Sequence, residues 1–150
     1  MKDYNKIEAS HLLSEYKIRI PYWRGENQFR KPLAAWARGG KLPWYQAYNA
    51  AKHDRHAAFA QATFDQLMDA VCGLVALLSA QFHTQDFAPG PELLALRGAP
   101  DGFENCIGSY FGMQPPKWPI EDRYTFSSED WQALIKTEAD PFVQYPYPVH

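Results

Sequence analysis

The chain contains few cysteines, no long apolar run and no segment that looks like a leader. The two cysteines, Cys72 and Cys106, form no C-x-x-C pair, so the spacing of a zinc site or a disulfide framework is missing. We expect both thiols to be free and the compartment to be reducing. The purest apolar run, Ala70 to Leu78, is far shorter than the roughly 20 residues that span a bilayer, and residues 1–13 lack an apolar core. We therefore expect a cytoplasmic protein with no membrane contact.

Net charge is also small, at −2, but the charges are unevenly distributed. Residues 1–56 hold 11 Lys/Arg against 5 Asp/Glu, whereas residues 57–150 hold 4 Lys/Arg against 12 Asp/Glu. A basic half is suited to phosphate or nucleic acid. The alternative is that the two halves attract each other, within the monomer or across a dimer. The charge pattern thus leaves both RNA and a protein partner open.

Helix-breaking residues are absent from a long central stretch. Neither glycine nor proline occurs in residues 44–72, and Pro43 directly precedes them. Proline favours the first turn of a helix, so a helix is predicted to start at Pro43. A single helix over 44–82 would be roughly 58 Å long at about 1.5 Å per residue, more than a domain of this size can hold. We therefore expect a bend, at the polar residues 53–56 or at Thr63.

The second half of this stretch carries the most regular apolar pattern in the chain. Its apolar side chains follow one another at offsets of three and four, which places them on one stripe of a helix. The stripe consists of Phe64, Leu67, Met68, Val71, Leu74, Val75, Leu78 and Phe82. We expect Leu74 and Leu78, at its centre, to be almost fully buried.

The other segments are short. Tyr16–Ile20 alternates apolar and basic residues as a half-buried strand does, and Cys106–Phe111 is a second short candidate strand. Lys31–Arg38 is predicted as a short helix, Ser127 as the start of another, and the proline-rich residues 140–150 as an extended tail. The sequence predicts a mainly α fold in one domain: a helical bundle around a long central helix, with long aromatic- and Pro-rich loops and room for a small β hairpin.

Chemically active residue types concentrate in one segment, Trp44–His56, which we call the polar segment. On a helical wheel its side chains form two adjacent faces that meet in one sector. The first face carries Tyr45, Tyr48, Lys52 and Arg55, and the second carries Asn49, His53 and His56. An anion held by cations beside an imidazole is what cleavage of a phosphodiester requires. The candidate catalytic residues are therefore His53, Arg55 and Asn49, and the candidate substrate-binding residues are Lys52, Tyr48, Tyr45 and His56.

Two other interpretations of the polar segment remain. His53 and His56 stand three residues apart and could share a metal, but Lys52 and Arg55 would repel a dication. We accordingly expect no metal and no other cofactor. The second interpretation is a solvated helix end, in which the segment is a structural corner of a non-catalytic protein–protein interaction module.

The pattern Tyr48-Asn49-x-x-Lys52-His53-x-Arg55, which leads into a long apolar helix, resembles the HEPN superfamily over residues 44–82. That superfamily consists of small helical bundles frequent in prokaryotic toxin–antitoxin and phage-defence systems, and many members are metal-independent endoribonucleases that act as dimers. Active members carry an Arg followed after four to six residues by a His. This chain lacks that hallmark and matches only a looser Asn-x-x-Lys-His variant. The resemblance implies an RNA-binding or RNA-cleaving homodimer, with His53 as general acid/base.

Overall fold

The computed structural model describes residues 6–82, 101–107, 110–119, 132–133 and 136. The chain divides into two compact units, Met1–Pro116 and Lys117–His150, and every element below belongs to the first. The elements in chain order, with η for a 3-10 helix, are α2 (Glu8–His11), η1 (Leu13–Glu15), β1 (Lys17–Arg19), β2 (Phe29–Arg30), η2 (Ala34–Arg38), α3 (Pro43–His53), α4 (Arg55–Ala58), η3 (Phe59–Gln61), α5 (Phe64–Phe82), β3 (Glu104–Cys106) and β4 (Phe111–Gln114).

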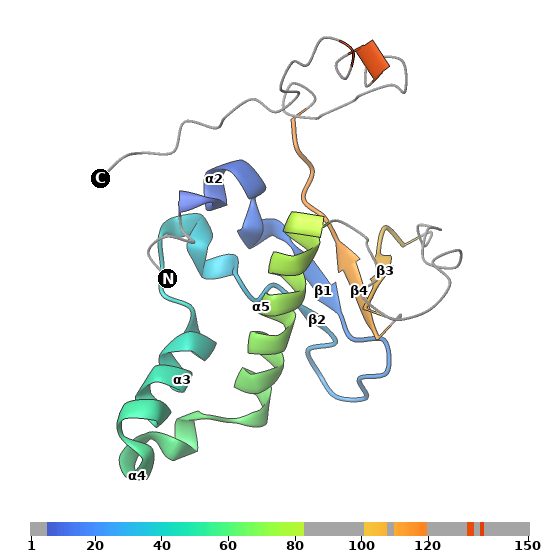
Figure 1. Ribbon diagram of the computed structural model, residues 1–150. Coiled ribbons are helices and arrows are strands. Elements are labelled where there is room, and N and C mark those ends of the chain that lie inside the picture. The colour runs from blue at the N-terminus through green and yellow to red at the C-terminus, as the bar shows by residue number, and fades with distance from the viewer. Residues whose placement is uncertain (1–5, 83–100, 108–109, 120–131, 134–135, 137–150) are drawn as a thin grey trace. The chain divides into compact units, whose positions relative to one another are not determined.

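The strands form one antiparallel sheet of four, in the order β2-β1-β4-β3 (Figure 1). Ile18 of β1 lies opposite both Arg30 of β2 and Met113 of β4. Residues directly opposite in adjacent strands share a face of the sheet. All three are buried, and α5 packs on β1 and β4. The apolar face of the sheet is thus covered by α5.

The helices begin and end where local chemistry favours it. Pro43 stands in the first turn of α3, as predicted. Asp54 ends α3 in a non-helical conformation, with φ −134° and ψ 79°, and its carboxylate accepts the Ala57 N–H at 3.0 Å, which starts α4. The Thr63 hydroxyl accepts the Gln66 N–H at 3.3 Å at the start of α5. The predicted bend is therefore present, at both of its candidate positions, and the chain reverses so that α3 packs against α5 (Figure 1).

Helix α5 does not bury the side that its apolar pattern indicates. The positions turned to the sheet and to η1 are Cys72, Val75, Ala76 and Ser79, all 4% exposed or less. Leu74 is 57% exposed and Leu78 only half-buried, so the prediction that both are almost fully buried is wrong. The reason is that α5 is apolar around much of its circumference, and periodicity alone does not select which apolar side meets the core.

The predicted fold class is also wrong, because the protein is a mixed α/β fold rather than a mainly helical bundle. The expected strand at Tyr16–Ile20 is confirmed as β1, but the expected strand Cys106–Phe111 instead spans the end of β3 and the start of β4. Between them, the Tyr110 N–H donates to the Ile107 carbonyl at 3.2 Å, which closes a turn. Strands of two to four residues are too short to show a period, so most of the sheet left no signal in the sequence.

Two predictions lie wholly or largely outside the described residues. The extended tail at 140–150 is one of them. The other is the helix that starts at Ser127, of which only residues 132, 133 and 136 are described, and these three are helical.

Candidate functional site: a groove between α3 and α5

The reversal of the chain between α3 and α5 leaves an open groove of about 560 Å³. Its walls come from one face of α3 and α4, from η3 and from the first half of α5. The lining residues are Trp44, Ala47, Tyr48, Ala51, Lys52, Arg55, Phe59, Ala62, Thr63, Gln66, Leu67 and Ala70. Alanines supply much of the wall, and their small side chains keep the facing helices from filling the space between them.

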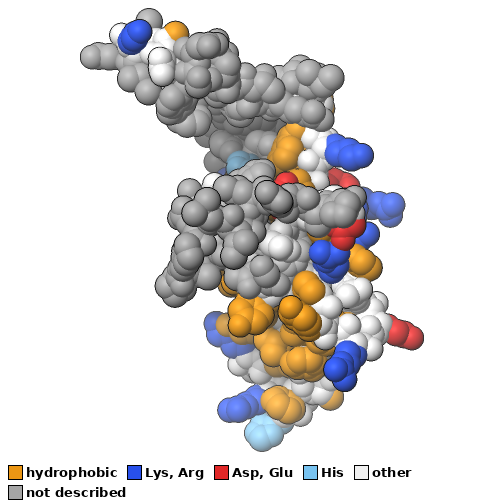
Figure 2. Space-filling view, turned by 90° about the vertical axis from the view of Figure 1, so that its right-hand side faces the viewer, with side chains coloured by type: hydrophobic (Ala, Val, Ile, Leu, Met, Phe, Trp, Pro, Cys, Tyr) orange, Lys and Arg blue, Asp and Glu red, His pale blue; other side chains and the backbone are white. Residues whose placement is uncertain are grey.

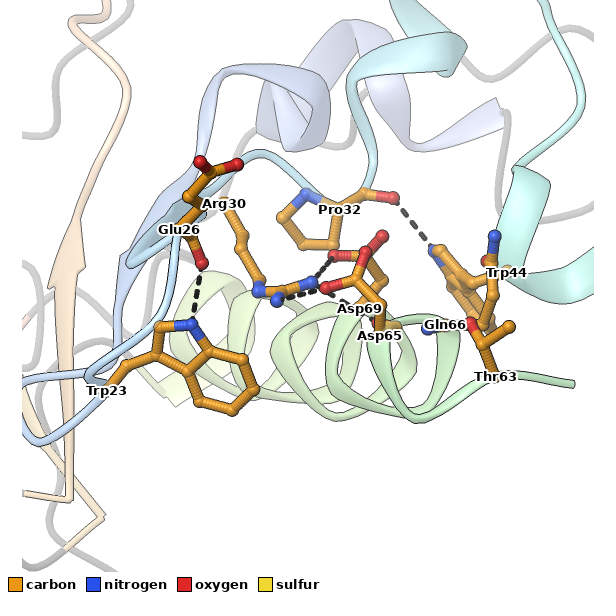
Figure 3. Close-up of polar contacts among 9 residues, drawn as sticks. All are labelled: Trp23, Glu26, Arg30, Pro32, Trp44, Thr63, Asp65, Gln66 and Asp69. Carbon is orange, nitrogen blue, oxygen red and sulfur yellow. Dashed lines mark hydrogen bonds and ion pairs between the residues drawn. The ribbon is translucent and has the colours of Figure 1, made fainter.

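The indole of Trp44 forms part of the groove wall. Its Nε1 donates to the Pro32 carbonyl at 2.9 Å (Figure 3). A glycine faces the ring: a Cβ added to Gly73 of α5 would lie 3.1 Å from the Trp44 ring. The missing side chain allows the indole to lie directly against α5. Trp44 thus ties the start of α3 to the middle of α5.

The structure divides the predicted site residues between two sides of the α3–α4 corner. Tyr48, Lys52 and Arg55 line the groove, whereas the candidates on the other face do not contribute to it. His53 and His56 are exposed, and Asn49 is partly buried away from the lining. Tyr45 also lies outside the groove, with its ring 6.2 Å from that of Tyr48. The predicted cations therefore meet an apolar groove, while the predicted imidazoles face elsewhere.

Two cations stand on the rim of the groove. Lys52 and Arg55 are exposed, and neither forms an ion pair within the described residues. The Lys52 ammonium lies 5.9 Å from the centre of the Tyr48 ring, within the range of a cation–π contact. The carboxylate between them, that of Asp54, is occupied as the cap of α4. The rim is accordingly positive and open to an anionic group.

The apolar side chains of the groove are only partly covered. Phe59 is 63% exposed, Leu67 55% and Tyr48 54%. Figure 2 shows hydrophobic side chains gathered on one face of the molecule, with Lys and Arg side chains at their edge. Large apolar groups exposed together mark interaction surfaces more often than single exposed residues do. The groove therefore combines uncovered apolar walls with a cationic rim.

A buried arginine with two partly exposed carboxylates joins α5 to the sheet. The Arg30 side chain is 3% exposed and reaches from β2 to two carboxylates of α5, with 2.6 Å to Asp65 and 2.7 Å to Asp69 (Figure 3). The Trp23 ring lies over the guanidinium, 5.3 Å from its carbon, and stacks on Phe64. Burial opposes the charged form of Arg30, but the hydrogen bonds to both carboxylates outweigh it and raise its pKa.

Some of these residues carry a signal in the sequence. Asp65 and Asp69 are the only charged residues of α5 and stand four apart, a spacing that brings both carboxylates to one face. Ala47 and Ala51 likewise share the face of Tyr48 and indicate close approach by another element. Phe59 carried no such signal, because its place in the groove depends on the turn between α4 and α5.

Chemically, the groove fits a ligand with an apolar surface and an anionic group. Among the described residues, no three His, Cys, Asp or Glu side chains come together as a metal site. Within the same residues no single helix is long and apolar enough to cross a membrane; Arg55–Gln61 and Phe64–Phe82 reach that length and composition only jointly, across a 76° bend.

The chain was compared with family models, curated proteins and solved structures, and it matches none of them.

Proposed function

We propose that this protein is a non-catalytic interaction module, and that its groove between α3 and α5 binds an acidic amphipathic segment of a partner protein. The observation that carries the proposal is the apolar groove edged by two cations that have no described ion-pair partner, Lys52 and Arg55. An amphipathic helix that lays its apolar face into such a groove is a recurring mode of peptide recognition.

The apolar walls would supply most of the affinity. Phe59, Leu67 and Tyr48 are each more than half exposed in the free protein. Covering such a side chain fully contributes about 1.5–3 kcal/mol before the costs of association, and the exposed half somewhat less. A partner that covers all three would thus gain enough to bind, with the cations setting its orientation.

The rim cations would select the charge of the partner. Lys52 and Arg55 are solvated, so a carboxylate opposite them adds little affinity but speeds encounter and disfavours basic partners. Peptides with glutamates at the flanks should therefore bind, and the same peptides with lysines should bind poorly.

RNA, which the resemblance to the HEPN superfamily implies, is the competing ligand. Exposed rings beside cations can stack bases and hold phosphates. However, His53 and Asn49 lie outside the groove, so an RNA strand in the groove would meet Arg55 but neither the predicted general acid/base, His53, nor Asn49. The geometry favours the protein segment, and RNA becomes an outcome of the test.

The test compares two fluorescent synthetic helical peptides by anisotropy. Both carry Leu at offsets of three and four, one with flanking Glu and one with flanking Lys. We expect the Glu peptide to bind at least about 10-fold more tightly. Lys52→Glu with Arg55→Glu should weaken its binding at least about 10-fold, whereas Lys41→Glu, an exposed lysine outside the groove, should leave it unchanged.

A groove-filling variant, Ala51→Trp, separates binding in the groove from binding elsewhere. It should abolish binding of the Glu peptide while the thermal melt stays cooperative. Binding that survives Ala51→Trp, or equal affinity for both peptides, would overturn the proposal. So would tight binding of single-stranded RNA that weakens steeply with salt and is lost on Lys52→Glu with Arg55→Glu. Chelator-resistant RNA cleavage lost on His53→Ala would establish the endoribonuclease instead.

A further inference from the structure

Helix α5 leaves a continuous apolar stripe on its outer side. Phe64 is 64% exposed, Leu67 55%, Leu74 57% and Phe82 38%. Val71 and Leu78 are partly exposed and lie between them. The offsets from Phe64 through Leu78 run three, four, three and four, so these side chains form one line along the helix. This outer stripe adjoins the groove only at Leu67.

Nothing charged interrupts the stripe. Residues 70–82 contain no Asp, Glu, Lys or Arg. The two acidic residues of α5, Asp65 and Asp69, are turned to the sheet and bound by Arg30. A helix that is apolar on its solvent side as well as its core side is expected to be covered on both. We therefore expect another apolar surface to cover the outer stripe.

We propose that the outer stripe of α5 packs against the same stripe of a second copy of this chain, with the two helices antiparallel. Alternating offsets of three and four are the spacing of a two-helix seam. In an antiparallel pair centred between residues 72 and 73, Leu74 of one copy meets Val71 of the other, and Leu67 meets Leu78. Each of these layers joins two apolar side chains, so this central part of the stripe is complementary to itself.

The area of the stripe agrees with a dimer contact. Its exposed and half-exposed side chains present on the order of 500 Å² of apolar surface per copy, a patch that soluble monomers seldom leave bare. Two copies would bury on the order of 1,000 Å² together, the lower limit for a specific interface. The antiparallel arrangement also places opposite ends of the two helix dipoles beside each other.

The test is the molar mass of the protein in solution, measured by light scattering and sedimentation. We expect a dimer for the wild type and a monomer for Leu74→Glu, because the pair would bury two carboxylates close to the two-fold axis. Tyr22→Glu is the matched control: Tyr22 is 80% exposed but lies outside α5, so this variant should remain a dimer. A wild type that is monomeric up to roughly 100 µM, or a Leu74→Glu variant that still dimerises, would overturn the proposal.

Cross-linking provides a second readout that does not depend on the Glu variant. The native thiols are inaccessible, since Cys72 is 0% and Cys106 4% exposed. Leu74→Cys thus introduces one reactive thiol on the stripe, and a short bismaleimide should link two copies of it. Tyr22→Cys should give no cross-linked dimer. Equal cross-linking of both variants would overturn the proposal, as would a monomer whose binding to neutral phospholipid vesicles is lost on Leu74→Glu.

Discussion

Arg30 differs from its two carboxylate partners in how much water it meets. Its side chain is 3% exposed, whereas those of Asp65 and Asp69 are 55% and 30% exposed. The cation would have no hydration if the carboxylates were lost, but the carboxylates would keep part of theirs if the cation were lost. The consequences of removing either side should therefore be unequal.

We expect Arg30→Met to lower the free energy of unfolding by about 2 kcal/mol, because the exposed carboxylates can hydrate. Asp65→Asn with Asp69→Asn should cost about 3–5 kcal/mol, because it strands a buried cation. Urea denaturation measures both. Lys31→Met is the control, since the Lys31–Glu15 pair is exposed and should contribute under about 1 kcal/mol. A larger loss for Arg30→Met would show that packing under Trp23, and not charge, dominates.

The candidate site was predictable in part at this scale. Spacing along a helix determines which side chains share a face, so the grouping of Tyr48 with Lys52 and Arg55 could be read from the sequence. Which face meets α5 could not, because Leu67 and Ala70 approach from a separate helix after two bends. Local spacing contains no information about that approach.

Two neighbouring positions of α5 test which side of this helix is buried in the core. Val75 is 2% exposed and Leu74 is 57% exposed. Val75→Ala should lower the free energy of unfolding by about 2–3 kcal/mol, as truncations in packed cores do, and Leu74→Ala by less than about 1 kcal/mol. Equilibrium unfolding at a protein concentration low enough to keep the chain monomeric measures both. A cost for Leu74→Ala equal to that of Val75→Ala would mean that the outer side of α5 is covered within the monomer.

The ends of the helices were predictable because their causes are local. Pro43, Asp54 and Thr63 each act on backbone groups within three residues. The sheet was not predictable, because β1 finds its partners by tertiary pairing. Its own alternation was visible in the sequence, but nothing near residue 18 indicates Met113 as the residue opposite. The predicted fold class was wrong because the sheet depends on this tertiary pairing.

Across the whole molecule, some of the basic residues in the first part of the chain form ion pairs with acidic residues in the rest of it. Arg19 pairs with Asp101, and Arg30 pairs with Asp65 and Asp69. Each of these pairs joins the basic residues 1–56 to the acidic remainder of the chain. For these cations, attraction between the two halves accounts for the charge pattern, and they are not available to a nucleic acid.

The stability of the whole molecule should fall at alkaline pH. Burial raises the pKa of the Cys72 thiol to about 11, and burial with the nearby charge of Glu104 raises the pKa of Tyr16 to about 12. The folded protein therefore retains protons that the unfolded chain releases above about pH 9. The stabilisation that these two groups contribute is fully present below that pH. The free energy of unfolding then declines as pH rises toward 11, by at most about 1.4 kcal/mol per pH unit for each group.

Urea unfolding between pH 8 and pH 11 measures this dependence. Cys72→Ala should remove the part of the decline that begins near pH 9 and leave the part due to Tyr16 at higher pH. An unfolding free energy that stays constant over this range would show that neither group is more protonated in the folded protein. The same slope in wild type and Cys72→Ala would assign the decline to other groups.

The pairing of β1 with β4 has a consequence for the newly made chain. Arg19 pairs with Gly112, 93 positions later, so one edge of β1 stays open while the ribosome makes all the intervening residues. Pairing over such a separation is slow, because a long loop must close first. During that interval the nascent chain presents an unpaired strand edge, which other chains can join. The helical part, α3 to α5, is complete much earlier and depends on near contacts, so it should form first and wait for the sheet.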